Sequence, residues 1–266
     1  MKTLIAAVQM VSTPDVDDNL NTAKHLIGEA ASKGAKLVLL PEFWPLMGNK
    51  DTDKLAYAET PGKGPIQSFL SDMAQKHKIW LIGGTIPLKA TEPDKVMNTV
   101  LVMNPEGKCA ARYDKIHLFR FNKNHEAYDE SATLVPGNEP CAAETPYGRI
   151  GLSVCYDLRF PELYRALGTC SLLVVPAAFT YTTGQAHWEI LLRARAIENQ
   201  CYVLASAQGG THVNGRRTWG HSMLIDPWGN IVDQLKEGEG VVLGEIDSER
   251  LEDVRSSLPA LQHRRL

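Results

Sequence analysis

The stretch Leu37-Val38-Leu39-Leu40-Pro41-Glu42 combines a short apolar run with an abrupt polar end. A continuous apolar run of this length, without alternation, is typical of a strand that is buried on both faces of a sheet. Open α/β sheets hold their ligands beyond the carboxyl ends of parallel strands. Glu42 is therefore a candidate functional residue, although a helix cap or a surface carboxylate remains an alternative.

The segments before and after this run predict an alternation of strands and helices. Residues 5–8 predict a buried strand, residues 17–32 and 65–77 predict helices, and residues 79–82 predict another strand. This order is typical of a mainly parallel sheet. The turn Pro105-Glu106-Gly107 predicts a hairpin, whose strands at residues 98–104 and 108–115 extend the sheet with antiparallel pairs.

The second half of the chain repeats this alternation. The expected strands and helices are residues 149–154, 160–167, 172–175, 186–199, 202–205, 223–225, 231–232 and 241–246. Residues 119–138 show no clear period and predict a long irregular excursion of the kind that often carries function. No linker-like tract separates the halves, so residues 1–266 are expected to form a single domain.

The composition excludes several classes of protein. With 44% hydrophobic and 22% charged residues among 266, the chain is expected to be globular and neither disordered nor fibrous. The net charge of -3, without a basic run, predicts no nucleic-acid partner. The apolar residues at the N-terminus are too few for a signal peptide or a membrane span, so no membrane is expected. Five cysteines without a CxxC pair indicate reduced thiols and a cytoplasmic location.

Cys155 follows the predicted strand at residues 149–154 in the way that Glu42 follows its own strand. A free cysteine is more often a small buried hydrophobe than a reactive group. However, Pro161 and Glu162 mark a helix start just after Cys155, and a helix N-terminus lowers the pKa of a thiol. The other four cysteines lack such a position, so Cys155 is the candidate nucleophile.

Other candidate residues are weaker when each is taken alone. Lys115 ends the second hairpin strand and could present a cation to an oxyanion, although a lone lysine is usually solvated. His117 and His187 could each pair with a cysteine, but the surroundings of a cysteine proteinase are missing. The eight histidines form no metal-binding spacing, and no phosphate-binding loop is present, so neither a metal nor a cofactor is expected.

Three segments, in this order along the chain, resemble the motifs of the nitrilase superfamily of carbon-nitrogen hydrolases. They are Leu39-Leu40-Pro41-Glu42, Tyr113-Asp114-Lys115-Ile116-His117-Leu118, and residues 151–162 around Cys155. Glu130 aligns with a second glutamate of the family. Residues 186–202 and 219–223 resemble the amidase branch, whereas residues 119–129 depart from it, and this leaves the substrate open.

The resemblance implies an α/β fold built as a four-layer α-β-β-α sandwich, and a homodimer or a higher homo-oligomer. The segments after Cys155 and residues 262–265 are the implied partner contacts. It also implies a Glu42, Lys115 and Cys155 triad that hydrolyses a small linear amide to an acid and ammonia through a thioester. Glu130 and the backbone N–H of Tyr156 are expected to support this chemistry.

Arg159 is a candidate for binding a substrate carboxylate, because an arginine can pair with a carboxylate through two hydrogen bonds. An internal salt bridge to Asp157 or Glu162 is the favoured alternative. A nitrilase, an N-carbamoyl amide hydrolase and a non-catalytic scaffold remain alternatives for the whole chain. Analysis of the products separates the first two from an amidase.

Overall fold

The computed structural model describes residues 2–123 and 126–265, and its first sheet grows around the run that contains Leu37. The sheet has seven strands in the order β15-β1-β2-β3-β5-β4, with β6 paired to β5. β1, β2 and β3 are parallel, and the other pairs are antiparallel. The strands are β1 (Lys2–Gln9), β2 (Leu37–Leu39), β3 (Trp80–Ile82), β4 (Ile86–Lys89), β5 (Val96–Met103), β6 (Cys109–Asp114) and β15 (Gly240–Asp247).

The second sheet has six strands in the order β14-β13-β12-β11-β10-β9. Its centre, β10 to β12, is again parallel, and antiparallel strands flank it. Each half of the chain therefore supplies a parallel centre whose strands end at a common edge. The strands are β9 (Ala142–Thr145), β10 (Gly148–Leu152), β11 (Leu172–Ala177), β12 (Tyr202–Ala207), β13 (Ser222–Ile225) and β14 (Ile231–Leu235).

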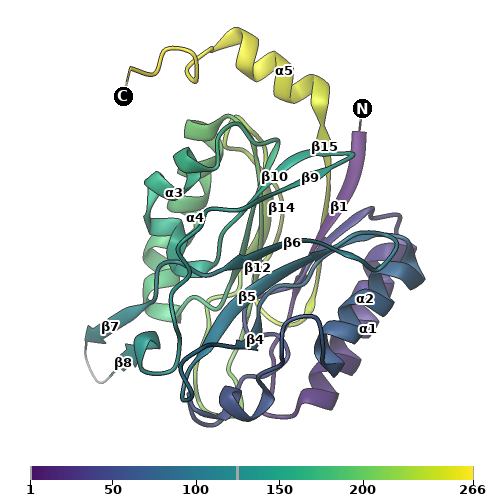
Figure 1. Cartoon of the computed structure of the whole chain (residues 1–266). Helices are drawn as coiled ribbons and strands as arrows, with labels where there is room; N and C mark the ends of the chain where they lie inside the picture. The colour runs from purple at the N-terminus through teal and green to yellow at the C-terminus, as the bar shows by residue number, and fades with distance from the viewer. Residues whose placement is uncertain (1, 124–125, 266) are drawn as a thin grey trace.

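Helices cover the outer faces of both sheets (Figure 1). α1 (Val16–Ser32) and α2 (Pro65–His77) lie on the first sheet, and α3 (Pro161–Ala166) and α4 (Tyr181–Asn199) lie on the second. α1 begins where the side chain of Asp15 accepts a hydrogen bond from the backbone of Asp18. α5 (Ser248–Ser257) follows β15 and extends past the end of the sheets.

Side chains in β2 alternate between two cores. Leu37 and Leu39 pack with the second sheet, whereas Val38 and Leu40 pack with α1 and α2. This alternation explains why the run is apolar throughout, since both faces of its sheet are covered. The four layers are therefore helices, sheet, sheet and helices, and the expected α-β-β-α sandwich is confirmed.

The two sheets are joined by polar contacts close to the ends of β1 and β12. The Ser206 hydroxyl donates to the carbonyl of Val8, and Gln208 donates to Ser12. Gln208 also donates to the backbone carbonyl of Glu42, at 3.1 Å. The strand ends of both sheets therefore meet, and the residues that follow them lie close together.

The main departure from the predicted elements is the region after Lys115. Residues 119–138 were expected to be irregular, but they contain a hairpin of β7 (Arg120–Lys123) and β8 (Glu126–Asp129) and the short 3₁₀ helix η2 (Glu130–Ala132). Strands of four residues are too short to show an alternation of apolar and polar residues in the sequence. The hairpin is held instead by contacts of the Phe119 ring with Phe121 and Tyr128. Asn124 and His125 lie outside the described residues.

Smaller departures have local causes. The helix expected at 186–199 begins at Tyr181, because the Thr180 side chain accepts a hydrogen bond from Thr183 and caps it. β4, β9 and α5 were not predicted. α5 is strongly polar and is held by Arg255, which donates to the carbonyls of Gln200 and Cys170.

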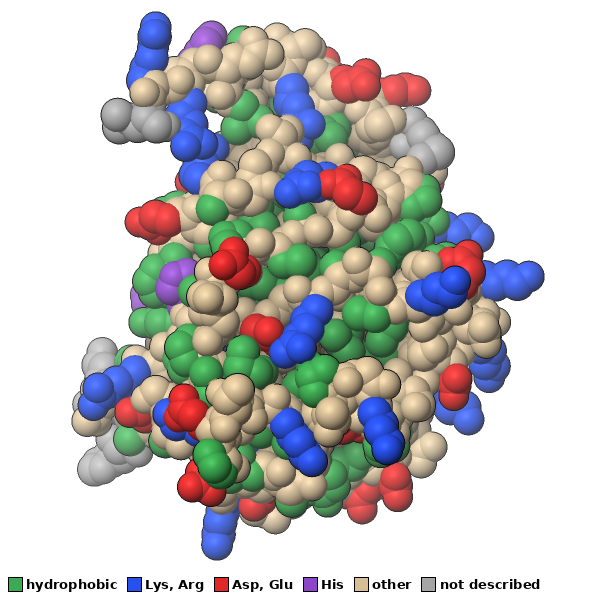
Figure 2. Space-filling view, in the orientation of Figure 1, with side chains coloured by type: hydrophobic (Ala, Val, Ile, Leu, Met, Phe, Trp, Pro, Cys, Tyr) green, Lys and Arg blue, Asp and Glu red, His purple; other side chains and the backbone are tan. Residues whose placement is uncertain are grey.

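The surface shows no single dominant charge on the face seen in Figure 2, where acidic and basic side chains are interspersed. Within the described residues, no helix is both long and apolar enough to cross a membrane.

Candidate active site

Glu42 lies just past the end of β2, and its side chain is 1% exposed. One carboxylate oxygen accepts hydrogen bonds from Lys115 Nζ at 2.9 Å and from Asn98 Nδ2 at 3.0 Å. The other oxygen accepts from the backbone N–H of Ala178 at 2.9 Å. Phe43 directly after it has a left-handed backbone, with φ 54°. The carboxylate is therefore held from three sides, and it is neither a helix cap nor a surface group.

Cys155 begins the 3₁₀ helix η3 (Cys155–Arg159), and its own φ is 49°. A left-handed conformation is strained for a residue with a side chain, and such strain is most common at functional sites. The residue is 7% exposed. It lines the same pocket as Glu42, so the ends of β2 and β10 bring these two predicted residues together.

The expectation of a lowered thiol pKa at Cys155 is wrong. Burial raises the pKa of this thiol well above its usual value, the negative charge of Glu42 raises it further, and Lys115 opposes both. The helix α3 starts at Pro161, six residues later, so Cys155 does not lie at its N-terminus. The free thiol is therefore protonated near neutral pH and needs a base.

Lys115 lies between two carboxylates and is 1% exposed, so its side chain is not solvated. Its Nζ donates to Glu42 at 2.9 Å and to both carboxylate oxygens of Glu130, at 2.9 and 2.8 Å. Burial alone would lower the pKa of this ammonium, but the charges of Glu130 and Glu42 outweigh burial and raise the pKa. Lys115 therefore stays charged.

Glu130, in η2, completes the cluster. Its carboxylate also accepts a hydrogen bond from the backbone N–H of Phe119 at 2.7 Å. Burial raises the pKa of Glu130, Lys115 opposes the shift, and Glu42 adds to it. The structure thus brings together the four side chains that the motifs singled out.

Asp157 is a structural member of the site that the sequence did not single out for this role. Its buried carboxylate accepts hydrogen bonds from Tyr113 Oη at 2.7 Å, from the backbone N–H of His117 at 3.0 Å and from that of Val154 at 2.8 Å. It therefore fastens the Lys115 segment to the Cys155 segment. His117 Nδ1 also lies 2.7 Å from Asp157, so His117 is occupied here and does not pair with a cysteine.

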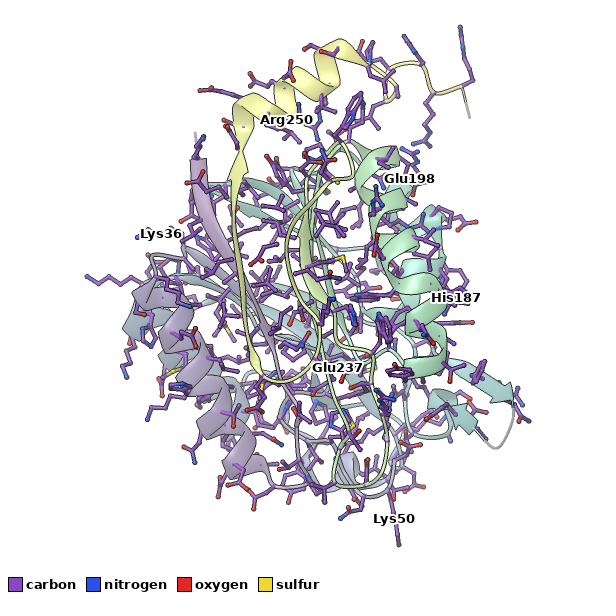
Figure 3. All side chains as sticks on the ribbon, turned by 180° about the vertical axis from the view of Figure 1, so that it is seen from behind. Lys36, Lys50, His187, Glu198, Glu237 and Arg250 are labelled. Atoms are coloured by element: carbon purple, nitrogen blue, oxygen red, sulfur yellow. The ribbon has the colours of Figure 1, made fainter. Side chains whose placement is uncertain are left out.

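Arg159 lines the pocket in front of Cys155. Its guanidinium lies 5.6 Å from the ring centre of Tyr156 and 5.4 Å from that of Phe179. Among the described residues it makes no ion pair with Asp157 or Glu162, so the favoured internal salt bridge is wrong. Its hydrogen-bonding neighbour is His187, which projects from the outer side of α4 (Figure 3).

Asn98 was missed as a site residue. It was predicted only as the start of a strand, yet it donates to Glu42, and its backbone carbonyl accepts from Lys115 at 3.0 Å. An amide at the start of an otherwise apolar strand was the available signal. In residues 2–123 and 126–265, no group of three potential ligands is placed to hold a metal ion.

The two-sheet sandwich with this buried site defines a class of protein. Residues 4–256 match the family model described as carbon-nitrogen hydrolase, and the chain belongs to this family. The expectation of an amidase-type hydrolase is also confirmed, because relatives named as amidases align with 98% of this chain.

Three relatives illustrate the similarity. The chain is 46% identical to deaminated glutathione amidase of Synechocystis, over 98% of this chain and 97% of that one. A Saccharomyces cerevisiae member of branch 10 of the nitrilase superfamily superposes with a TM-score of 0.88 at 35% identity, covering 100% and 97% of the two chains. A mutant of the amidase from Nesterenkonia sp. AN1, in which acrylamide has added to the active site cysteine, superposes with a TM-score of 0.80 at 26% identity, covering 98% of this chain and 99% of that one.

Proposed function

We propose that the chain is a thiol amidase that uses Cys155 as nucleophile, Glu42 as general base and acid, and Lys115 as the oxyanion-stabilising cation. The observation that carries this proposal is the shared buried site, in which Lys115 donates to Glu42 at 2.9 Å and Cys155 lines the same pocket as Glu42. The active site cysteine of the Nesterenkonia amidase supports the assignment of the nucleophile.

In the first half-reaction, Glu42 takes the thiol proton of Cys155 as the sulfur attacks the amide carbon. The oxyanion that forms is stabilised by Lys115 and by the backbone N–H of Tyr156. Glu42 then gives its proton to the nitrogen, the carbon–nitrogen bond breaks, and a thioester remains on Cys155. The raised pKa of the thiol makes this proton transfer necessary, because little thiolate exists beforehand.

In the second half-reaction, Glu42 takes a proton from water, whose oxygen attacks the thioester carbon. The carbon–sulfur bond breaks, the acid leaves, and the proton returns from Glu42 to the sulfur. Glu130 keeps Lys115 in place through two hydrogen bonds and balances its charge. Its role is to position Lys115, and it is not the base.

The substrate class follows from Arg159 and from the relatives. A guanidinium at the pocket suits a carboxylate-bearing acyl group. Deaminated glutathione is such a compound, a 2-oxoglutaryl amide of cysteinylglycine. Its hydrolysis releases an amine, whereas a primary amide such as 2-oxoglutaramate releases ammonia. We propose small amides of this kind as substrates.

A homodimer or a higher homo-oligomer in the cytoplasm is part of the proposal. Ile190 and Ile197 on α4 are 70% and 50% exposed, and Trp228 and Val232 add apolar surface at 53% and 47%. Exposed apolar residues of this kind support association. The five unpaired cysteines suit a reducing compartment.

The test is hydrolysis of deaminated glutathione, 2-oxoglutaramate, succinamate and a ureido acid, each with the wild type and with Cys155→Ala. Cysteinylglycine or ammonia release that the variant loses supports a thiol amidase. Carbon dioxide from the ureido acid alone would indicate a carbamoylase instead. No product from any of them would contradict the proposed substrate class.

A further inference from the structure

A second cavity of about 390 Å³ adjoins the pocket that holds Cys155. It is lined by Phe43, which directly follows Glu42, and by Lys54, Tyr128 and Arg216. Arg216 also lines the first pocket, so the two cavities adjoin at this side chain. Nothing in the proposed chemistry uses Lys54 or Arg216.

The position of Arg216 is tightly determined. Its backbone is held in a turn, where its carbonyl accepts from His212 at 2.8 Å and its N–H donates to Asn214 at 2.9 Å. Its guanidinium donates to the carbonyl of Ala178 at 3.0 Å, and the N–H of Ala178 holds Glu42. Ala178 therefore contacts both Glu42 and Arg216.

The guanidinium has hydrogen-bonding capacity that the protein does not use. Arg216 Nε is fully buried and is the one such side-chain nitrogen or oxygen, among the described residues, without a hydrogen-bond partner. An unpaired buried donor is costly, and such a donor calls for an explanation. In the described part of the chain, neither Arg216 nor Lys54 has a carboxylate within ion-pair distance.

Lys54 brings a second positive charge to the same cavity. Its ammonium lies 3.2 Å from Thr133 Oγ1 and 5.2 Å from the ring centre of Phe43. Burial lowers its pKa, the carboxylates of Asp51 and Glu130 oppose this, and the charges of Arg216 and Lys115 add to it. Both cations line the same cavity, so an anion bound there would lie close to two positive charges.

We propose that this cavity binds the carboxylate at the leaving-group end of the substrate, through Lys54 and Arg216. The inference rests on the proposed function and deepens it. Glu42 protonates the leaving nitrogen, so the leaving group lies on the side of Glu42, where Phe43 opens into the cavity. Arg159 faces the acyl end. The preferred substrate is then an amide of an acid-bearing amine, such as a dipeptide with a free C-terminus.

The test compares deaminated glutathione with its C-terminal glycinamide, which differs only in the carboxylate. The wild type should hydrolyse the acid with a kcat/KM about tenfold higher, the scale of one charge-assisted hydrogen bond. Lys54→Met should remove most of this preference, and Lys54→Arg should retain it. Lys50→Met is the matched control, since Lys50 lies at the rim of the same cavity and points outward into solvent (Figure 3).

Binding is measured separately by calorimetry with S-methylcysteinylglycine and its C-terminal amide. The acid should bind about tenfold more tightly to the wild type and to Lys50→Met, but not to Lys54→Met. Equal kcat/KM values for the acid and the glycinamide would overturn the subsite while leaving the amidase intact. If neither deaminated glutathione nor its glycinamide is hydrolysed, the proposed function fails. The calorimetric preference for the acid over the amide then decides for or against the subsite. Equal effects of Lys50→Met and Lys54→Met would also overturn it.

Discussion

The ends of β2 and β10 meet in one site but hold their residues differently. After β2, the Glu42 carboxylate is bound by three donors and is 1% exposed. After β10, Cys155 lines the pocket that Glu42 also lines. Both ends have a left-handed backbone, at Phe43 and at Cys155 itself. The first sheet therefore supplies a base in a fixed position, and the second supplies a nucleophile that can reach a substrate.

Removal of the nucleophile should have the largest effect. Cys155→Ala should lower kcat by several orders of magnitude, about 10⁶-fold where a nucleophile acts in a catalytic unit. Its melting temperature should change little, because alanine keeps the Cβ atom and only the sulfur is removed. Cys109→Ala, which removes an exposed thiol, is the control and should keep full activity. Near-native turnover in Cys155→Ala would refute the assignment.

Removal of the base should come next. Glu42→Gln should lower kcat by about 10²–10⁴-fold. It should also lower the pKa of the Cys155 thiol, because the charge of Glu42 is one of the causes that raise it. Thiolate absorbance during a pH titration, with Cys155→Ala as the blank, measures this shift. An unchanged thiol pKa would show that the two strand ends are not coupled electrostatically.

Lys115→Met tests the charge balance of the site. It leaves two buried carboxylates without their cation and should lower the free energy of unfolding by about 3–5 kcal/mol. The pKa of Glu130 is raised in the folded state, so the folded protein binds more protons than the unfolded one above the usual glutamate range. Stability should therefore fall as pH rises through the raised pKa of Glu130.

In the variant the fall in stability should extend to higher pH, because Lys115 no longer opposes the raised pKa of Glu130. Denaturant titrations at several pH values measure it, with Lys33→Met, at an exposed ion pair, as the control. A variant as stable as the wild type at every pH would contradict the ion-pair cluster.

Asp157→Asn tests the connection between the Lys115 and Cys155 segments. An amide cannot accept all the hydrogen bonds that reach both carboxylate oxygens, so about 1–3 kcal/mol of stability should be lost. kcat should fall about tenfold, because the cation and the nucleophile lose their shared anchor. Thermal unfolding and kcat are both measured. A loss of stability with unchanged kcat would limit Asp157 to a structural role.

The smallest effect on catalysis is expected from a change at Arg159, which lines the pocket. Arg159→Lys should raise KM for carboxylate-bearing amides about tenfold, because a lysine cannot replace a bidentate pair. KM for neutral amides of similar size should change much less. Equal changes in both KM values would remove Arg159 from substrate binding.

The sequence predicted the parts of this site that lie at strand ends. Glu42 and Cys155 could be found because a polar residue after a buried run is conspicuous, and the motif order then identified Lys115 and Glu130. The partners of Asn98 and Asp157 could not be predicted, because they are 56 residues away at Glu42 and 44 residues away at Tyr113. Contacts over such separations depend on the packing of the two sheets.

The same limit explains the errors in charge and pairing. The pKa of Cys155 was expected to fall from its position before a helix, but burial against Glu42 raises it. The ion pair expected for Arg159 fails because Asp157 is already occupied by Tyr113 and His117. The pKa of Cys155 and the pairing of Arg159 therefore depend on residues that are close in space but distant in the sequence.

The most direct test of the account is mass spectrometry of the acid-quenched enzyme during turnover of 2-oxoglutaramate. The account predicts an acyl adduct on the peptide that contains Cys155, and no adduct and no turnover in Cys155→Ala. An adduct on one of the other four cysteines, or turnover by Cys155→Ala, would contradict it.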